Sequence, residues 1–236
     1  MTFRIKVWDL PLRIFHWLLV AAVSAAFVTG ELGGALQDWH GRIGVAVLGL
    51  LVFRLAWGLV GSHHARFSTF FPTPGRVRAY IKGEWQGHGH NPLGALSVLA
   101  LLGVLATLVS TGLFANDDIA FEGPMVGLIS KDLSDQVSYW HSLIFNVLAG
   151  LVVLHVAAIT FYLKVKKTNL VLPMLTGEKR LPHPVPEHAK GAGLIGFILV
   201  AAMSGVVVWI VASGTLLHIL QPAPVVPPAP TAAQNW

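Results

Sequence analysis

The segment from Gln136 to Leu163 constrains this chain most, because it contains no charged side chain. A helix crosses a bilayer with about 20 apolar residues, so the segment predicts a membrane-spanning helix. It contains His141 and His155. Fourteen residues at about 100° each bring both rings to nearly the same face, about 21 Å apart along the axis. An ionisable side chain inside a membrane helix is costly, which makes both histidines candidate functional residues; two hydrogen-bonded core histidines are the alternative.

The composition of the chain is that of an integral membrane protein. Of its 236 residues, 54% are hydrophobic and 11% are charged, and the mean hydropathy is +0.67, whereas soluble proteins have about 25% charged residues. The chain has no cysteine. That excludes disulfides, cysteine-ligated zinc or iron–sulfur clusters, and covalently attached haem. The pI near 9.7 reflects the topology described below, and we expect no nucleic-acid partner.

Apolar runs predict an all-α integral membrane protein, with a four-helix transmembrane bundle and a fifth transmembrane helix. The expected spans are 12–29, 38–60, 92–114, 136–163 and 192–217. A short interfacial helix is expected at 77–82, and an acidic loop at 116–135. We divide the chain into a four-helix domain (1–180), the fifth helix (181–220) and a tail (221–236). Five prolines in the tail predict an extended, disordered segment.

Charges outside the spans predict the orientation. The N-terminal segment and the 61–91 and 164–190 loops share one side and contain 13 Lys and Arg residues. The 31–42 and 116–135 segments on the other side contain two, with seven acidic residues. Because cytoplasmic loops carry the excess of Lys and Arg, we expect a multi-pass protein of the bacterial inner membrane. Its N-terminus is then cytoplasmic and its C-terminus periplasmic.

This orientation assigns a depth to each histidine of the helices. His16 on the first span and His155 on the fourth lie near the cytoplasmic surface, while His40 on the second and His141 on the fourth lie near the outer surface. Two pairs follow, His16 with His155 and His40 with His141. Arg54 lies fourteen residues after His40 and therefore on the same face. A buried arginine favours an anionic partner such as a haem propionate, although an arginine that extends to the interface is an equal alternative.

Haem is the metal group that two imidazoles on facing helices suit best. A zinc site has four ligands, so a pair of histidines does not complete it. A haem already supplies four nitrogens, and two imidazoles then fill both axial positions. We therefore expect His16, His40, His141 and His155 to bind two haem b groups as metal ligands. A proton relay would use acidic residues within the membrane, and the five expected spans contain none beyond Asp38, the first residue of the second span.

Four motifs resemble those of the bacterial cytochrome b561 and nickel–iron hydrogenase b-type cytochrome superfamily. They are VWDLPLRIFHW at 7–17, DWHGRIG at 38–44, FRLAWGLVGS at 53–62 and YWHSLIFN followed by HV in the fourth span. The resemblance covers about residues 5–180, and its ligand positions match the four histidines above. It implies a di-haem b subunit that exchanges electrons between the quinone pool and a periplasmic redox partner, either a c-type cytochrome or a hydrogenase.

Two other classes of function stay open on the sequence. The first is a self-contained oxidoreductase, such as a superoxide- or small-molecule:quinone reductase. The second is a histidine-based metal or proton transporter, which would contain no haem. A quinone substrate has two candidate locations, near Arg54, His63 and His64 on the inner side or near Trp39 and Arg42 on the outer side.

Overall fold

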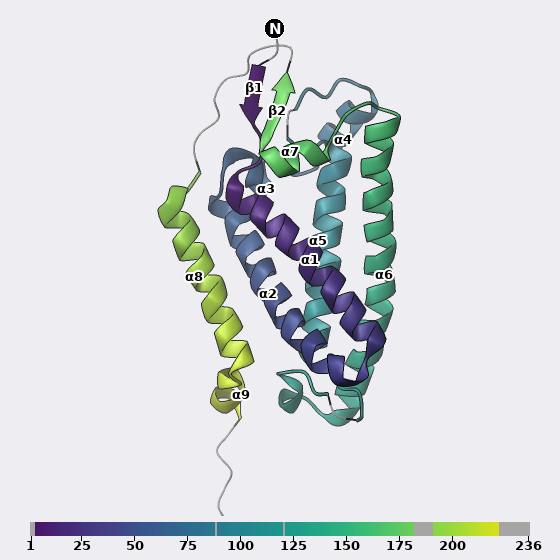
Figure 1. Cartoon of the computed structure of the whole chain (residues 1–236), viewed down its shortest axis with the longest axis vertical. Helices are drawn as coiled ribbons and strands as arrows, with labels where there is room; N and C mark the ends of the chain where they lie inside the picture. Colours follow the sequence, from purple (N-terminus) through teal and green to yellow (C-terminus); the bar gives the residue numbers. More distant parts are fainter. Residues whose placement is uncertain (1–2, 88, 120, 182–190, 222–236) are drawn as a thin grey trace, which may run out of the picture.

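Five long helices dominate the computed structural model, which describes residues 3–87, 89–119, 121–181 and 191–221 (Figure 1). All five are long and apolar enough to cross a membrane. They are α1 (Leu10–Leu32), α2 (Gln37–Val60), α5 (Pro92–Gly112), α6 (Lys131–Lys164) and α8 (Gly193–Ala212). The predicted all-α membrane fold with five spans is therefore confirmed, and the chain is a multi-pass membrane protein.

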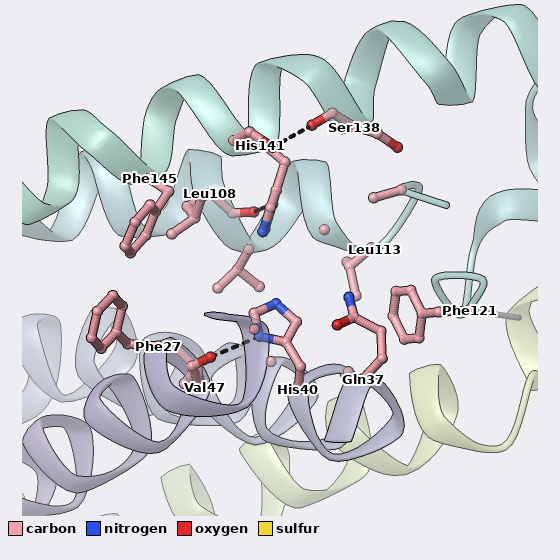
Figure 2. A pocket seen from close by; sticks show the side chains of 18 of the residues that line it. Phe27, Gln37, His40, Val47, Leu108, Leu113, Phe121, Ser138, His141 and Phe145 are labelled. Carbon is pink, nitrogen blue, oxygen red and sulfur yellow. Dashed lines mark hydrogen bonds between the residues drawn. The ribbon is translucent and has the colours of Figure 1, made fainter. Parts of the chain in front are cut away.

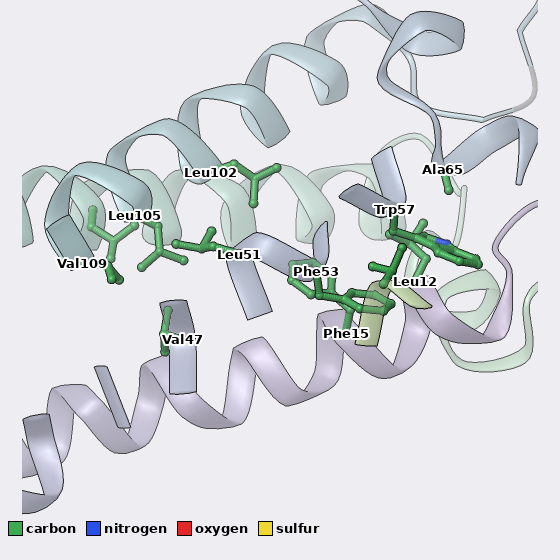
Figure 3. Close-up of a cluster of buried hydrophobic side chains, with 12 residues drawn as sticks. Leu12, Phe15, Val47, Leu51, Phe53, Trp57, Ala65, Leu102, Leu105 and Val109 are labelled. Atoms are coloured by element: carbon green, nitrogen blue, oxygen red, sulfur yellow. The ribbon is translucent and has the colours of Figure 1, made fainter. Parts of the chain in front are cut away.

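Four of the helices form a bundle around a single core. Close backbone contacts pair α1 with α2 and α5 with α6, and α2 also packs against α5. The core cluster takes side chains from all four helices, among them Phe15 of α1, Leu51 of α2, Leu105 of α5 and Leu148 of α6 (Figure 3). The fifth helix, α8, packs against α2, a contact that the sequence did not predict, and adds Val200 to the core cluster (Figure 1).

Short elements gather at the two ends of the bundle. The end that carries the N-terminus has β1 (Phe3–Lys6), η2 (His63–Ala65), α3 (Phe67–Phe70), α4 (Pro74–Ile81), α7 (Val171–Thr176) and β2 (Glu178–Leu181) (Figure 1). The opposite end has η1 (Gly34–Leu36), η3 (Val126–Leu128) and α9 (Thr215–Leu220). The segments predicted to share the basic side thus lie together at one end.

The strands β1 and β2 form an antiparallel sheet that was not expected. Phe3 pairs with Leu181 and Lys6 with Glu178. The sheet ties the N-terminal segment to the connection that follows α6, and the backbone N–H of Val7 extends it with a hydrogen bond of 2.9 Å to the Gly177 carbonyl. Strands of four residues, one of them with three consecutive charged residues, give too short a pattern to predict from sequence.

Helix boundaries differ from the predicted ones mainly at α6. This helix begins at Lys131 and not at the end of the acidic loop, because Ser130 caps it by accepting a hydrogen bond from Leu133 N at 3.3 Å. The last predicted span is divided, since α8 ends at Ala212 and α9 follows after Gly214, which has φ +68°. The short helix predicted at 77–82 corresponds to α4, which begins at Pro74, and its place in the membrane interface stays a prediction. The predicted disorder of the tail concerns residues 222–236, outside the described residues.

Candidate functional site

The four histidines lie on the helices that the sequence predicted. His16 belongs to α1, His40 to α2, and His141 and His155 to α6. His40 and His141 face one another near the end that carries η1 and η3, with ring centroids 6.0 Å apart and ring planes at 84° (Figure 2). If both imidazoles bound one metal ion, each metal–nitrogen bond would be about 2 Å long and each ring centroid would lie about 1 Å beyond its nitrogen. The two centroids would then be separated by a similar distance. This pair is therefore spaced to hold one metal ion between two imidazoles.

Backbone carbonyls fix the orientation of both rings. His40 Nδ1 donates to the carbonyl of Ala26 on α1 at 2.8 Å, and His141 Nδ1 donates to the carbonyl of Leu108 on α5 at 2.9 Å. A carbonyl oxygen only accepts, so the proton of each neutral ring resides on Nδ1 and Nε2 carries a lone pair. Hydrogen bonds of this kind orient metal-binding histidines and raise their basicity. Both imidazoles are thus prepared as ligands through Nε2.

Two glycines provide the room for these rings on the neighbouring helices. A Cβ on Gly30 of α1 would lie 2.9 Å from His40 Nδ1, and a Cβ on Gly112 of α5 would lie 2.9 Å from His141 Cε1. Such contacts are closer than real Cβ atoms make, so either change displaces the ring. The sequence analysis did not identify this role. For Gly112 this role could have been predicted, because Gly112 lies near the end of the third expected span and His141 near the start of the fourth, at a similar depth.

The two histidines share a cavity of about 500 Å³, within the range of about 300–1,000 Å³ that cofactor pockets occupy. All four bundle helices line it, and Phe27 of α1 stacks on Phe145 of α6 beside the pair at 5.6 Å between ring centroids (Figure 2). Polar side chains at the end that carries η1 and η3 include Glu31 and Asn116. The apolar walls and the two opposed imidazoles fit a haem.

A metal ion without a macrocycle fits this site less well. Within the described ranges, no group of three or more His, Asp or Glu side chains is arranged to hold a metal ion. Two imidazoles alone leave half of a tetrahedral coordination shell unfilled. The donor set therefore favours a group that brings most of its own ligands, which agrees with the expectation from sequence.

The second pair, His16 and His155, has a different environment from that of His40 and His141. His155 of α6 lies close enough to His16 of α1 to interact with it electrostatically. His16 Nδ1 is buried and has no hydrogen-bond partner among the described residues, and its ring packs edge-on against Trp17 at 5.1 Å between centroids. The pairing predicted from depth is thus compatible with the structure. The carbonyl partners that orient the outer rings have no described equivalent at this pair.

Arg54 is buried in α2, with 2% of its surface exposed. Its Nη1 donates to the carbonyl of Ala65 at 3.2 Å, and its guanidinium lies over the ring of Phe67 at 4.4 Å from the centroid. Asp9 is near enough to interact with it electrostatically. Arg54 was predicted to have an anionic partner such as a haem propionate. Asp9 already provides part of that negative charge within the protein. Contact between Arg54 and a haem stays a prediction.

The loop residues considered for a quinone lie at both ends. His63 and His64 line a second, smaller pocket at the end that carries the N-terminus. At the other end Arg42 lies over the ring of Trp39, 5.3 Å from its centroid. Neither of these two arrangements is part of the cavity between His40 and His141.

Comparisons with known proteins agree on one family. Residues 7–177 match the family described as prokaryotic cytochrome b561. The chain is 25% identical over 223 residues to a probable Ni/Fe-hydrogenase B-type cytochrome subunit of Azotobacter vinelandii, covering 78% of this chain and 91% of the relative. It is 23% identical over 216 residues to the protein of the same name from Bradyrhizobium diazoefficiens, covering 75% and 86%. No solved structure matches significantly.

The matched region begins before His16 and ends after His155, so it contains all four histidines and the whole four-helix bundle. It also contains Gly30 and Gly112, which lie against the rings of His40 and His141, and Ala26 and Leu108, whose carbonyls accept hydrogen bonds from those rings. A match of this extent shows that the chain belongs to the prokaryotic cytochrome b561 family, and with it to the membrane proteins that transfer electrons through haem b.

Proposed function

We propose that this chain carries electrons across the bacterial inner membrane through two haem b groups. His40 and His141 would hold one near the periplasmic surface, and His16 and His155 the other near the cytoplasmic surface. His141 and His155 are about 21 Å apart along α6, so the two groups would together span most of the apolar layer of about 30 Å. When bound, haem supplies a one-electron couple at its iron.

The observation that carries this proposal is the geometry of the outer pair. Each imidazole donates from Nδ1 to a carbonyl and is left with a basic Nε2, and the two rings face one another across a cavity of cofactor size. Two such ligands fill both axial positions of a haem iron, which favours electron transfer over oxygen binding. The stacked rings of Phe27 and Phe145 add an apolar wall beside the site.

The redox partners are inferred from the two faces of the molecule. The relatives are named as b-type cytochrome subunits of Ni/Fe-hydrogenases, which supports a hydrogenase-like protein as the electron partner on the periplasmic side. A c-type cytochrome is the other candidate there. The acidic side chains of the outer loops favour a partner with a basic docking surface. The quinone pool would be the second partner.

The first test is a pyridine haemochrome assay with a reduced-minus-oxidised spectrum on the purified chain. We expect two haem b per chain with sharp low-spin bands. A folded protein that binds no haem, although it was produced with an adequate haem supply, would overturn the proposal and return attention to metal or proton transport. One haem per chain would restrict the proposal to a single pair.

A second test addresses the partners. The protein in liposomes is reduced with a water-soluble quinol, and reoxidation of its haem is followed after a purified c-type cytochrome or an oxidised hydrogenase is added. We expect fast reoxidation only in the presence of such a partner. Steady reduction of a quinone by superoxide or another small reductant, with no protein partner present, would instead identify a self-contained oxidoreductase.

A further inference from the structure

A second pocket of about 210 Å³ lies at the end of the bundle that carries the N-terminus. It is formed between the segment 63–76 and the segment 85–92, which precedes α5. Its polar side chains are cationic or neutral: His63, His64, Thr69, Arg76 and His90. No acidic side chain is among the described residues that line it. This pocket is separate from the cavity between His40 and His141.

The position of the pocket along the chain sets its depth in the membrane. His63 lies three residues after the end of α2, and His90 lies two residues before the start of α5. Both helices span the apolar layer, so the pocket lies just outside it, within the headgroup region that adds about 5–8 Å on each side. Phe71, which precedes α4, and Ile81, its last residue, are 54% and 74% exposed. Apolar side chains beside arginines in a short helix suit an element that lies in the membrane interface.

The pocket is held in shape by hydrogen bonds of the protein. Arg76 donates from Nη1 to the carbonyls of Thr69 at 2.9 Å and Phe71 at 3.0 Å, which fixes its guanidinium at the rim. Thr69 Oγ1 donates to the His63 carbonyl at 2.6 Å. At the far end of α4, the Tyr80 hydroxyl bonds to that of Tyr162 on α6. The site is therefore prepared before any ligand arrives.

His90 is buried between two aromatic rings and lies within electrostatic reach of Arg54. Its ring lies between Trp8 and Phe70, at 4.5 Å and 4.6 Å between centroids, and its Nδ1 is buried without a hydrogen-bond partner among the described residues. Burial lowers the pKa of His90 to about 3, and the positive charge of Arg54 acts in the same direction. A bound anion would compensate both effects.

We propose that this pocket binds the phosphate of an anionic phospholipid headgroup from the leaflet on the basic side of the membrane. Basic pockets among membrane-spanning helices on the cytoplasmic side recognise such headgroups. Arg76 offers a guanidinium for the phosphate oxygens, and an imidazole N–H from His90 or His63 offers a further donor. The small volume and polar lining suit a headgroup better than a quinone ring, which favours a mostly apolar pocket.

Lipid binding to the purified, haem-loaded full chain tests the proposal. The protein in detergent is titrated with phosphatidylglycerol or phosphatidylcholine of the same acyl chains, and bound lipid is counted by native mass spectrometry. We expect one saturable site that prefers phosphatidylglycerol by about fivefold or more. The variants Arg76→Gln and His63→Ala should each lose most of this preference. Arg78→Gln is the matched control, because Arg78 lies on α4 but does not line the pocket, and it should keep the preference.

Other outcomes would overturn the proposal. Equal binding of the two lipids, or an equal loss in the Arg78 variant, would mean attraction to the basic surface in general. Saturable binding of inorganic phosphate without a preference between the lipids would identify a soluble anion as the ligand. Displacement of the bound lipid by a water-soluble quinone would assign the pocket to that substrate. His63→Ala keeps the test informative if Arg76→Gln fails to fold, since it removes none of the hydrogen bonds of Arg76.

Discussion

The Nε1 atom of Trp57 donates a hydrogen bond of 3.0 Å to Oδ2 of Asp9. The other oxygen of the same carboxylate, Oδ1, accepts from Leu12 N at 2.8 Å and caps α1. The backbone N–H of Ser62 also points to Oδ2, at 3.3 Å. One carboxylate thus begins the first span and attaches it to the last turn of the second span, the two helices that present His16 and His40.

Replacing Asp9 by Ala should lower stability by about 1–3 kcal/mol, because it removes a helix cap and leaves the indole N–H of Trp57 without an acceptor. Thermal unfolding of the purified protein measures the change. Asp38→Ala is the matched control, since Asp38 also lies in the first turn of a span and its carboxylate makes no described hydrogen bond. If both variants melt at the same temperature as the unchanged protein, the Asp9 carboxylate does not stabilise the contact between α1 and α2.

Replacing Gly112 by Ala should remove the haem held by His141, since the added Cβ would lie 2.9 Å from the ring. Gly103→Ala is the matched control on the same helix, because a Cβ there meets nothing within 4 Å. The haemochrome ratio should fall from two to about one haem per chain in the first variant and stay unchanged in the second. Two haems in the Gly112 variant would show that the ring is free to move aside.

Single histidine changes should separate the two haems. His155→Ala is expected to remove the inner haem and His141→Ala the outer haem, each leaving one low-spin species in the reduced-minus-oxidised spectrum, with a different redox midpoint in each variant. His218→Ala in α9 serves as the control and should keep both. If both haems survive the His155 change, the pairing with His16 is wrong.

Replacing Arg54 by Gln distinguishes the two roles open to this residue. If the guanidinium contacts a propionate of the inner haem, the midpoint potential of that haem should fall, because a nearby positive charge that favours the reduced form is lost. If Arg54 serves only Asp9, Ala65 and Phe67, the protein should become less stable while both midpoints stay unchanged. Redox titration and thermal unfolding of the same sample provide the two measurements.

The orientation can be tested cleanly because the chain has no cysteine of its own. Single cysteines are introduced as Ile119→Cys, at a side chain that is 90% exposed, and as Lys82→Cys at the other end. A membrane-impermeant maleimide applied to intact spheroplasts should label the first variant and not the second. Labelling of the second alone would reverse the proposed topology.

The sequence predicted the spans and the histidine faces because both follow from helix periodicity and apolar length, which act locally. The rings of His40 and His141, which depth alone placed together, lie 6.0 Å apart between centroids, and their role as ligands stays a prediction. The partners of their Nδ1 atoms were not predictable, because the carbonyls of Ala26 and Leu108 belong to apolar residues that give no sign of accepting a hydrogen bond. Their positions depend on how α1 packs against α2 and α5 against α6.

The elements that were missed depend on contacts between distant segments. The pairing of β1 with β2 joins residues that are more than 170 positions apart, and the pocket beside His63 and Arg76 is formed by two loops. The early start of α6 was predictable in principle, since Ser130 is a good cap and precedes Lys131. The acidic residues of this first turn instead suggested a loop.

The pairing of β1 with β2 also fixes an order of events during synthesis. Strand β1 is among the first segments made, but its partner leaves the ribosome only after all four spans of the bundle have been made. At about 5–20 residues per second, β1 waits roughly ten to thirty seconds for β2. The sheet at the basic end can therefore form only after the four spans of the bundle have been made, and until then α1 and α6 are held together by packing inside the bundle, such as the stacking of Phe27 on Phe145.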